Sequence, residues 1–129
     1  MELPLSDISD REILDARPAR NSLDVDRPYE FLVEPERGAD GLIEHVATIF
    51  LVNRECSFRC LMCDLWKNTT VKSVPVGAIP QQIDYALERS PKAQHAKLYN
   101  SGNFFDAKAI PKEDWPVIVE RVRGFKSII

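Results

Sequence analysis

Apolar residues recur along the chain with two different periods. Residues 46–52 are almost continuously apolar, which is typical of a strand buried on both faces in a parallel sheet. Residues 79–89 carry apolar side chains at 79, 83, 86 and 87, the stripe of an amphipathic helix, and Pro91 follows the end of that stripe. Residues 95–99 then predict a second short strand.

Upstream of the buried strand, the pattern predicts a helix and a hairpin. Ser9 and Glu12 form a capping box, so a short helix is expected over residues 9–16. Residues 29–33 and 42–52 are rich in β-branched and aromatic side chains. They flank the turn-rich residues 35–41, which favours a β-hairpin.

Downstream of residue 99, a further helix and strand are predicted. Pro111 suits the first turn of a helix that runs to about Arg123, and Gly124 is its expected C-terminal cap. Residues 125–129 read as the start of a third parallel strand. The alternation of strands and helices predicts an α/β fold with right-handed βαβ units. Three such strands leave an apolar edge open, so we expect the domain to continue beyond Ile129 or to pair with another chain.

Composition and charge narrow the function classes. The 129 residues are 44% hydrophobic and 29% charged, which is ordinary for a globular protein. No apolar run approaches the roughly 20 residues of a membrane span, and no signal peptide is evident, so we expect a cytoplasmic protein without a membrane partner. The net charge of -3, with scattered basic residues, shows no dedicated nucleic-acid stripe, although an RNA substrate remains compatible with it.

The three cysteines carry the most specific chemistry. Cys56, Cys60 and Cys63 are spaced C-x3-C-x2-C, so one loop can place three thiolates around a compact metal cluster. Three ligands on a four-iron cluster leave one iron without a protein ligand. That open iron could bind a substrate or cofactor, whereas a structural zinc normally has four protein ligands.

Two alternatives remain at this stage. A small non-catalytic zinc-binding domain would need His45 or His95 as a fourth ligand, but neither has a usual ligand spacing from the cysteines. Three inert buried thiols fit poorly beside polar neighbours such as Arg54, Glu55 and Asp64.

The run of residues 52–63, directly after a buried strand, resembles the defining loop of the radical S-adenosylmethionine (radical SAM) superfamily. The resemblance implies that Cys56, Cys60 and Cys63 bind a 4Fe-4S cluster whose open iron binds SAM. It implies a 5'-deoxyadenosyl radical as product, and an electron donor such as a flavodoxin or ferredoxin as partner. The implied fold is an incomplete (βα) barrel, formed by residues 42–129 after an N-terminal extension of residues 1–41.

The same resemblance implies a second group of cofactor-binding residues. Met62 stands where the family usually has an aromatic side chain near the adenine. Asn100, Ser101, Gly102 and Asn103 occupy the turn that meets the methionine amino group of SAM, although an ordinary turn after a strand explains them equally well. More narrowly, the sequence resembles proteins grouped with archaeosine synthase, which modify a base in transfer RNA. A truncated fragment that binds a cluster without turnover is a further possibility.

Overall fold

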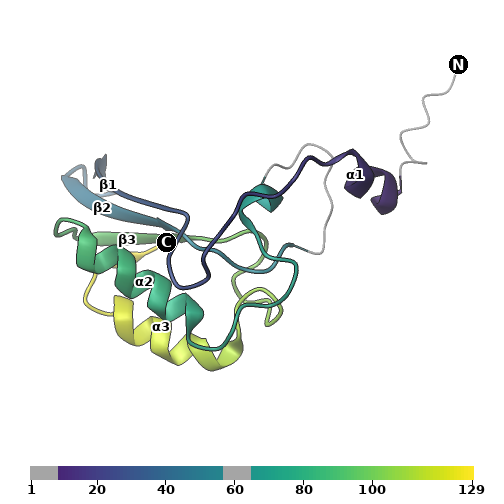
Figure 1. Cartoon of the computed structure of the whole chain (residues 1–129). Coiled ribbons are helices and arrows are strands. Elements are labelled where there is room, and N and C mark those ends of the chain that lie inside the picture. Colours follow the sequence, from purple (N-terminus) through teal and green to yellow (C-terminus); the bar gives the residue numbers. More distant parts are fainter. Residues whose placement is uncertain (1–8, 57–64) are drawn as a thin grey trace, which may run out of the picture.

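The computed structural model describes residues 9–56 and 65–129, which form a mixed α/β arrangement of one sheet with helices against it (Figure 1). In chain order the elements are α1 (Asp10–Ala16), β1 (Glu30–Arg37), β2 (Ile43–Phe50), η2 (Leu65–Asn68), α2 (Ala78–Arg89), β3 (His95–Tyr99), η3 (Lys112–Asp114), α3 (Trp115–Val122) and β4 (Ser127–Ile128). The longest helix, α2, has 12 residues, so no described helix is long and apolar enough to cross a membrane.

The four strands lie in the order β1-β2-β3-β4. Strands β1 and β2 form the predicted antiparallel hairpin, whereas β2, β3 and β4 are parallel, as the alternation of strands and helices predicted. Strand β1 extends to Arg37, beyond its predicted end, and includes Pro35. An edge strand tolerates a proline because that position need not donate a ladder hydrogen bond.

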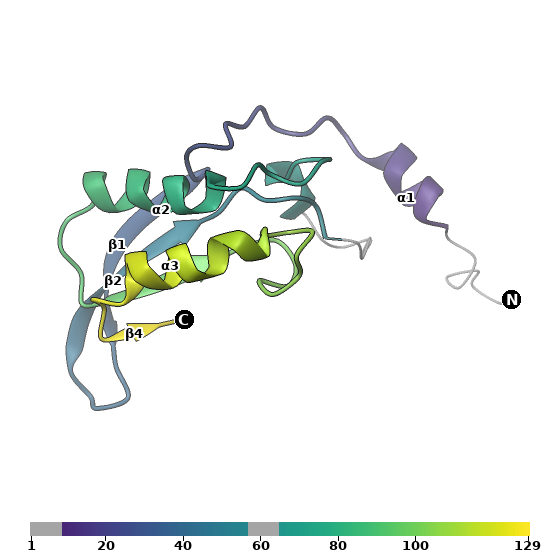
Figure 2. The same cartoon turned by 90° about the horizontal axis from the view of Figure 1, so that it is seen from below.

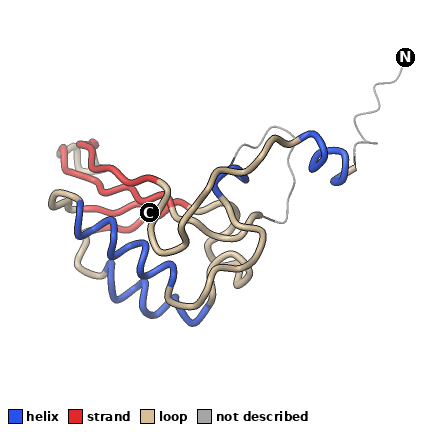
Figure 3. The backbone as a smooth tube through the Cα atoms, in the orientation of Figure 1, coloured by secondary structure: helices blue, strands red, loops and turns tan. Residues whose placement is uncertain are grey.

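Helices α2 and α3 lie side by side on one face of the sheet, as seen in Figures 2 and 3. The core between the layers joins Ile49 and Leu51 to Ile79 and Ile83 of α2 and to Ile118 of α3, all of them buried. Consecutive residues 46–49 are buried as well, which confirms the expected burial of β2 on both faces. Because β2 and β3 are parallel, their carboxyl ends lie at the same end of this sheet.

The helix ends agree with the sequence in one place and differ in another. Ser9 and Glu12 form the predicted capping box at the start of α1. The predicted helix after Pro111 begins instead as the 3₁₀ turn η3, and the C-cap of α3 is Arg123. Gly124 does not adopt a left-handed conformation, because the Phe125 amide donates to the Val122 carbonyl and a tight turn leads directly into β4.

Candidate functional site

Cys56 lies at the end of the sheet where the parallel strands have their carboxyl ends. It follows β2 by six residues, is half-buried and has a free thiol as far as the described residues show. Cys60, Cys63 and Met62 lie outside the described residues. Among the residues that the structure describes, no three His, Cys, Asp or Glu side chains are grouped to hold a metal ion.

The turn that follows β3 lies directly against Cys56. Gly102 has φ +90°, and a Cβ atom added to it would lie 3.3 Å from Cys56 Sγ and 3.2 Å from Cys56 Cβ. An L-residue at this φ is strained, and the space is already occupied. The structure therefore brings Cys56, the described member of the cysteine group, next to the predicted Asn-Ser-Gly turn.

A buried asparagine holds the two groups together. Asn53 is fully buried, and its Oδ1 accepts a hydrogen bond of 3.1 Å from the Ser101 amide. Its Nδ2 donates to the Ser101 carbonyl at 2.9 Å and to the Arg54 carbonyl at 2.8 Å. The side-chain amide thus pairs with the Ser101 backbone as a neighbouring strand would, and it continues the β2–β3 pairing past the Leu51 amide, which donates to the Tyr99 carbonyl.

Helix α2 fixes the residue before Asn53 in a similar way. The side chain of Gln82 is fully buried, and its Oε1 accepts from the Val52 amide at 2.7 Å. Its Nε2 donates to the Val52 carbonyl at 2.8 Å and to the Val25 carbonyl at 2.9 Å. Since buried amides without partners are costly, these bonds hold the backbone at a defined position before Cys56.

The remaining turn residues are more exposed. Asn103 is exposed, and its Oδ1 accepts from the Phe105 amide at 3.0 Å, an Asx turn. Asn100 is half-buried, and its Nδ2 makes a long contact of 3.4 Å with the Ser101 carbonyl. No described residue accepts a hydrogen bond from Asn103 Nδ2, so this donor is available to a ligand.

The two ends of the cysteine segment meet. The Thr70 amide donates to the Asn53 carbonyl at 3.0 Å, and the Glu55 amide donates to the Thr70 carbonyl at 2.9 Å. Arg54 and Thr70 thereby form a parallel bridge. Glu55 and Thr70, on either side of the cysteine segment, therefore lie next to each other beyond the carboxyl end of β2.

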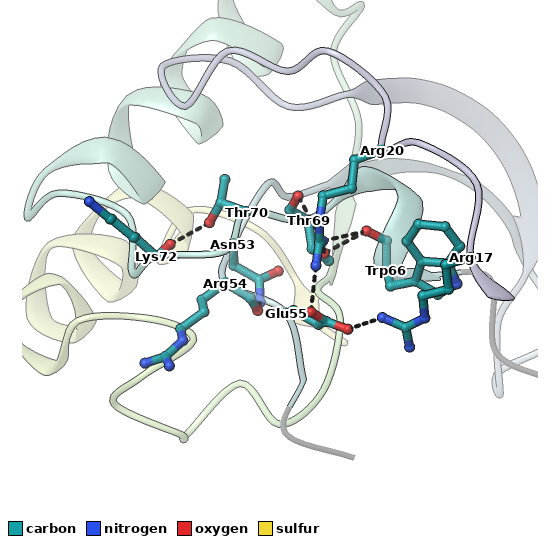
Figure 4. Close-up of polar contacts among 9 residues, drawn as sticks. All are labelled: Arg17, Arg20, Asn53, Arg54, Glu55, Trp66, Thr69, Thr70 and Lys72. Atoms are coloured by element: carbon teal, nitrogen blue, oxygen red, sulfur yellow. Dashed lines mark hydrogen bonds and ion pairs between the residues drawn. The ribbon is translucent and has the colours of Figure 1, made fainter. Parts of the chain in front are cut away.

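Two arginines from the segment before β1 bind residues on both sides of the cysteine segment, as Figure 4 shows. Arg17 and Arg20 each form an ion pair with Glu55, whose side chain is 11% exposed. Arg20 also donates to the Trp66 carbonyl at 2.9 Å and to Thr69 Oγ1 at 2.6 Å. The Arg17 guanidinium lies 4.6 Å from the centre of the Trp66 ring, a cation–π contact. Residues on both sides of the cysteine loop are thus bound to one N-terminal segment.

The charge of Glu55 is favoured by this arrangement. Burial by itself raises the pKa of Glu55, but hydrogen bonds and charge interactions with Arg17 and Arg20 together outweigh burial and hold that pKa below its usual range. Glu55 is therefore ionised at neutral pH, next to Cys56. Sequence reasoning missed Arg17, Arg20 and Asn53, because the arginines lie in a segment without periodicity and the asparagine precedes the cysteines without a distinctive spacing.

The two histidines lie at the opposite end of the sheet. His95 opens β3, and its ring contacts Ser127 Oγ at 2.6 Å through Nδ1 and Glu44 Oε1 at 3.3 Å through Nε2. His45 lies near the start of β2. The chain from His95 to Asn100 spans about 16 Å at 3.3 Å per residue, so this geometry disfavours a zinc site that joins either histidine to Cys56.

Comparisons with known proteins add one relative. No model of a known protein family matches the chain, and no solved structure matches it. The uncharacterized protein MJ0550 of Methanocaldococcus jannaschii is 24% identical over 119 residues, covering 84% of this chain. The chain spans about a third of the length of that protein. The name of this relative gives no activity.

Asn53→Asp is expected to lower the free energy of unfolding by about 1–3 kcal/mol, because a carboxylate cannot donate to the buried Ser101 and Arg54 carbonyls. Urea unfolding followed by circular dichroism measures the change. Asn103→Asp is the matched control, since Oδ1 of the exposed Asn103 accepts a bond that a carboxylate also accepts. Equal effects of the two substitutions would contradict the role given to Asn53.

Glu55→Gln is expected to destabilise the fold at pH 7 by about 1–3 kcal/mol, because two arginines lose a charged acceptor. The folded-state pKa of Glu55 is lowered, so its contribution is complete above the unfolded pKa of about 4.3 and is lost as the pH falls through the folded pKa. Unfolding curves of parent and variant should therefore converge in acid. Glu120→Gln, at an exposed ion pair, should change the free energy by less than about 0.5 kcal/mol throughout.

Proposed function

We propose that Cys56, Cys60 and Cys63 bind a 4Fe-4S cluster with one open iron, and that the turn of residues 100–103 helps to bind S-adenosylmethionine there. The observation that carries the proposal is the position of Gly102 beside Cys56 at the carboxyl end of parallel strands, where a Cβ atom on Gly102 would meet the Cys56 side chain. When bound, the reduced cluster supplies the electron that cleaves SAM to methionine and a 5'-deoxyadenosyl radical, which removes hydrogen from a substrate.

The described residues fit such a group. Cys56 is half-buried rather than sealed in the core, so its thiolate can reach a cluster. The missing side chain of Gly102 leaves room for Cys56, because a Cβ atom at this position would lie only 3.3 Å from the sulfur. Ligands commonly bind at the carboxyl ends of parallel strands, where loops from neighbouring strands converge.

Each residue of the site has a task in this proposal. Asn53 and Gln82 hold the backbone before Cys56 in place. Asn53 also fixes the position of the turn through its hydrogen bonds to Ser101. Asn100 and Asn103 supply polar groups for the amino and carboxylate groups of SAM. Met62 is assigned to the adenine by the family resemblance alone. Strands β2 to β4 with their helices form part of a (βα) barrel, whose reaction space lies at the carboxyl ends of the strands.

The substrate class is a proposal drawn from the resemblance alone. Proteins near archaeosine synthase act on a transfer RNA base, and we propose RNA as the first class to test. The chain spans about a third of the length of its relative, so the reaction and substrate of a whole protein stay proposals.

Cys60→Ala is expected to abolish stable incorporation of iron and sulfide, because two thiolates remain where three are required. The measurement is anaerobic reconstitution of the full chain, followed by iron and sulfide analysis, dithionite reduction, addition of SAM and assay for 5'-deoxyadenosine. Parent chain should bind about four irons per chain and form 5'-deoxyadenosine, and the variant should do neither.

Circular dichroism and urea unfolding of the unloaded chains show whether Cys60→Ala still folds. Equal iron and sulfide in both chains would overturn the ligand assignment. Stoichiometric zinc without iron or sulfide in anaerobically purified parent would favour the non-catalytic zinc domain instead.

A further inference from the structure

A second group of polar side chains lies at the amino ends of the parallel strands, at the opposite end of the sheet from Cys56. His95 Nδ1 lies 2.6 Å from Ser127 Oγ, and His95 Nε2 lies 3.3 Å from Glu44 Oε1. A hydroxyl, an imidazole and a carboxylate are thus linked in series across β4, β3 and β2. A hydroxyl beside a base that a third group orients is the arrangement that activates a nucleophile.

The register of the sheet places these residues on one face. Val46 pairs with His95, and His95 pairs with Ser127, so the three lie in one row across the parallel strands. Side chains alternate along a strand, and Ile49 of β2 packs toward the helices. The row therefore faces away from α2 and α3, and Glu44, two residues before Val46, shares its face.

Hydrogen-bond chemistry assigns a role to each ring nitrogen of His95. Glu44 also accepts a hydrogen bond of 2.6 Å from Lys126 Nζ. This bond, together with the bond to His95, outweighs burial and holds the pKa of Glu44 below its usual range, so the carboxylate is ionised at neutral pH. An ionised carboxylate only accepts hydrogen bonds, so Nε2 of a neutral His95 carries the hydrogen. Nδ1 is then the nitrogen that accepts the proton of Ser127, as a general base must.

A cavity of about 800 Å³ opens onto this group, within the size range of small-molecule sites. Val46 and Ile129 provide apolar surface in its wall. The charged side chains in the wall are those of Glu36, Arg37, Asp40, Glu44 and Lys97. Two of the three carboxylates already bind a lysine, at 2.6 and 2.7 Å. A wall of balanced charges with an apolar part favours a neutral ligand over an anion or a cation.

We propose that Ser127 is the nucleophile of an esterase site in this cavity, with His95 as its general base and Glu44 as a positioning residue. The substrate class is a neutral carboxylic ester whose short acyl chain lies against the apolar part of the wall. The site is separate from the cysteine group, so it does not depend on the function proposed for the cysteines.

The reaction balances in two steps. Ser127 Oγ bonds to the ester carbonyl carbon while its proton passes to His95 Nδ1, and the alkoxide leaves with that proton as an alcohol. A water molecule then attacks the acyl carbon and gives a proton to His95, and the carboxylic acid leaves as Ser127 takes that proton back. Lys97, in the same wall, is the cation assigned to stabilise negative charge on the carbonyl oxygen.

The test uses the full chain before any cluster is reconstituted, with 4-nitrophenyl butyrate as a neutral ester that has a short apolar acyl chain. Ser127→Ala and His95→Gln should each lower kcat/KM roughly 100-fold or more, because the nucleophile or the base is lost. Ser73→Ala is the matched control, since Ser73 is an exposed serine whose hydroxyl donates to the Lys108 carbonyl. Its kcat/KM should stay within about twofold of the parent.

Glu44→Gln tests the positioning role. It should lower kcat roughly tenfold or more and leave KM within about twofold, because an amide can donate to Nε2 and favour the wrong tautomer without reshaping the cavity. Loss of the ion pair with Lys126 alone would lower stability in urea unfolding and leave kcat unchanged. Such a result would contradict the role given to Glu44.

Covalent labelling of the parent tests the nucleophile without any substitution. A fluorophosphonate ester should attach to Ser127, as located by fragmentation mass spectrometry, and the label should be lost in a His95→Gln variant that circular dichroism shows to be folded. A parent whose Ser127 takes no label overturns the proposal. A folded Ser127→Ala that hydrolyses the ester at the parent rate overturns it as well.

Discussion

The site depends on one buried side-chain amide, that of Asn53, which bonds to both backbone groups of Ser101. The loops that follow β2 and β3 can diverge unless hydrogen bonds join them. Here the Asn53 side-chain amide makes the pair of hydrogen bonds that a further residue of a β-strand would make. Gln82 binds the backbone of Val52, the residue before Asn53. Helix α2, the end of β2 and the turn after β3 are therefore joined by adjacent hydrogen bonds. A buried amide without its partners would cost stability, which makes this arrangement specific as well as stabilising.

A second set of contacts ties the N-terminal segment to the same point. Arg17 and Arg20 bind Glu55 before the cysteine loop, and Trp66 and Thr69 after it. The short segment that leads into β1 thus acts as a support for the loop, although its sequence resembles a simple connection. Charged hydrogen bonds suit this role because they are directional and survive partial exposure.

Local sequence patterns predicted much of the fold. They could not predict polar contacts between residues far apart in the sequence. The apolar stripe of residues 79–89 predicted α2 to within one residue, and β3 matches residues 95–99. Gly124 was wrong as a left-handed cap because the chain turns directly into β4. The pairing of Asn53 with Ser101 joins residues 48 positions apart, and no periodicity encodes such a partner. The cysteine spacing predicts the chemistry, while the contact of Gly102 with Cys56 emerges only from the folded sheet.

The proposed function requires that SAM meets the cluster at the turn beside Cys56. The direct measurement is the SAM-dependent change in the electron paramagnetic resonance spectrum of the reduced cluster, per bound iron, in Gly102→Ala and Gly77→Ala. Both glycines have φ near +90°, but an added Cβ has no neighbour within 4 Å at Gly77 and meets Cys56 at Gly102. The account predicts that Gly77→Ala retains the spectral change and that Gly102→Ala loses most of it. An unchanged response in Gly102→Ala would contradict it.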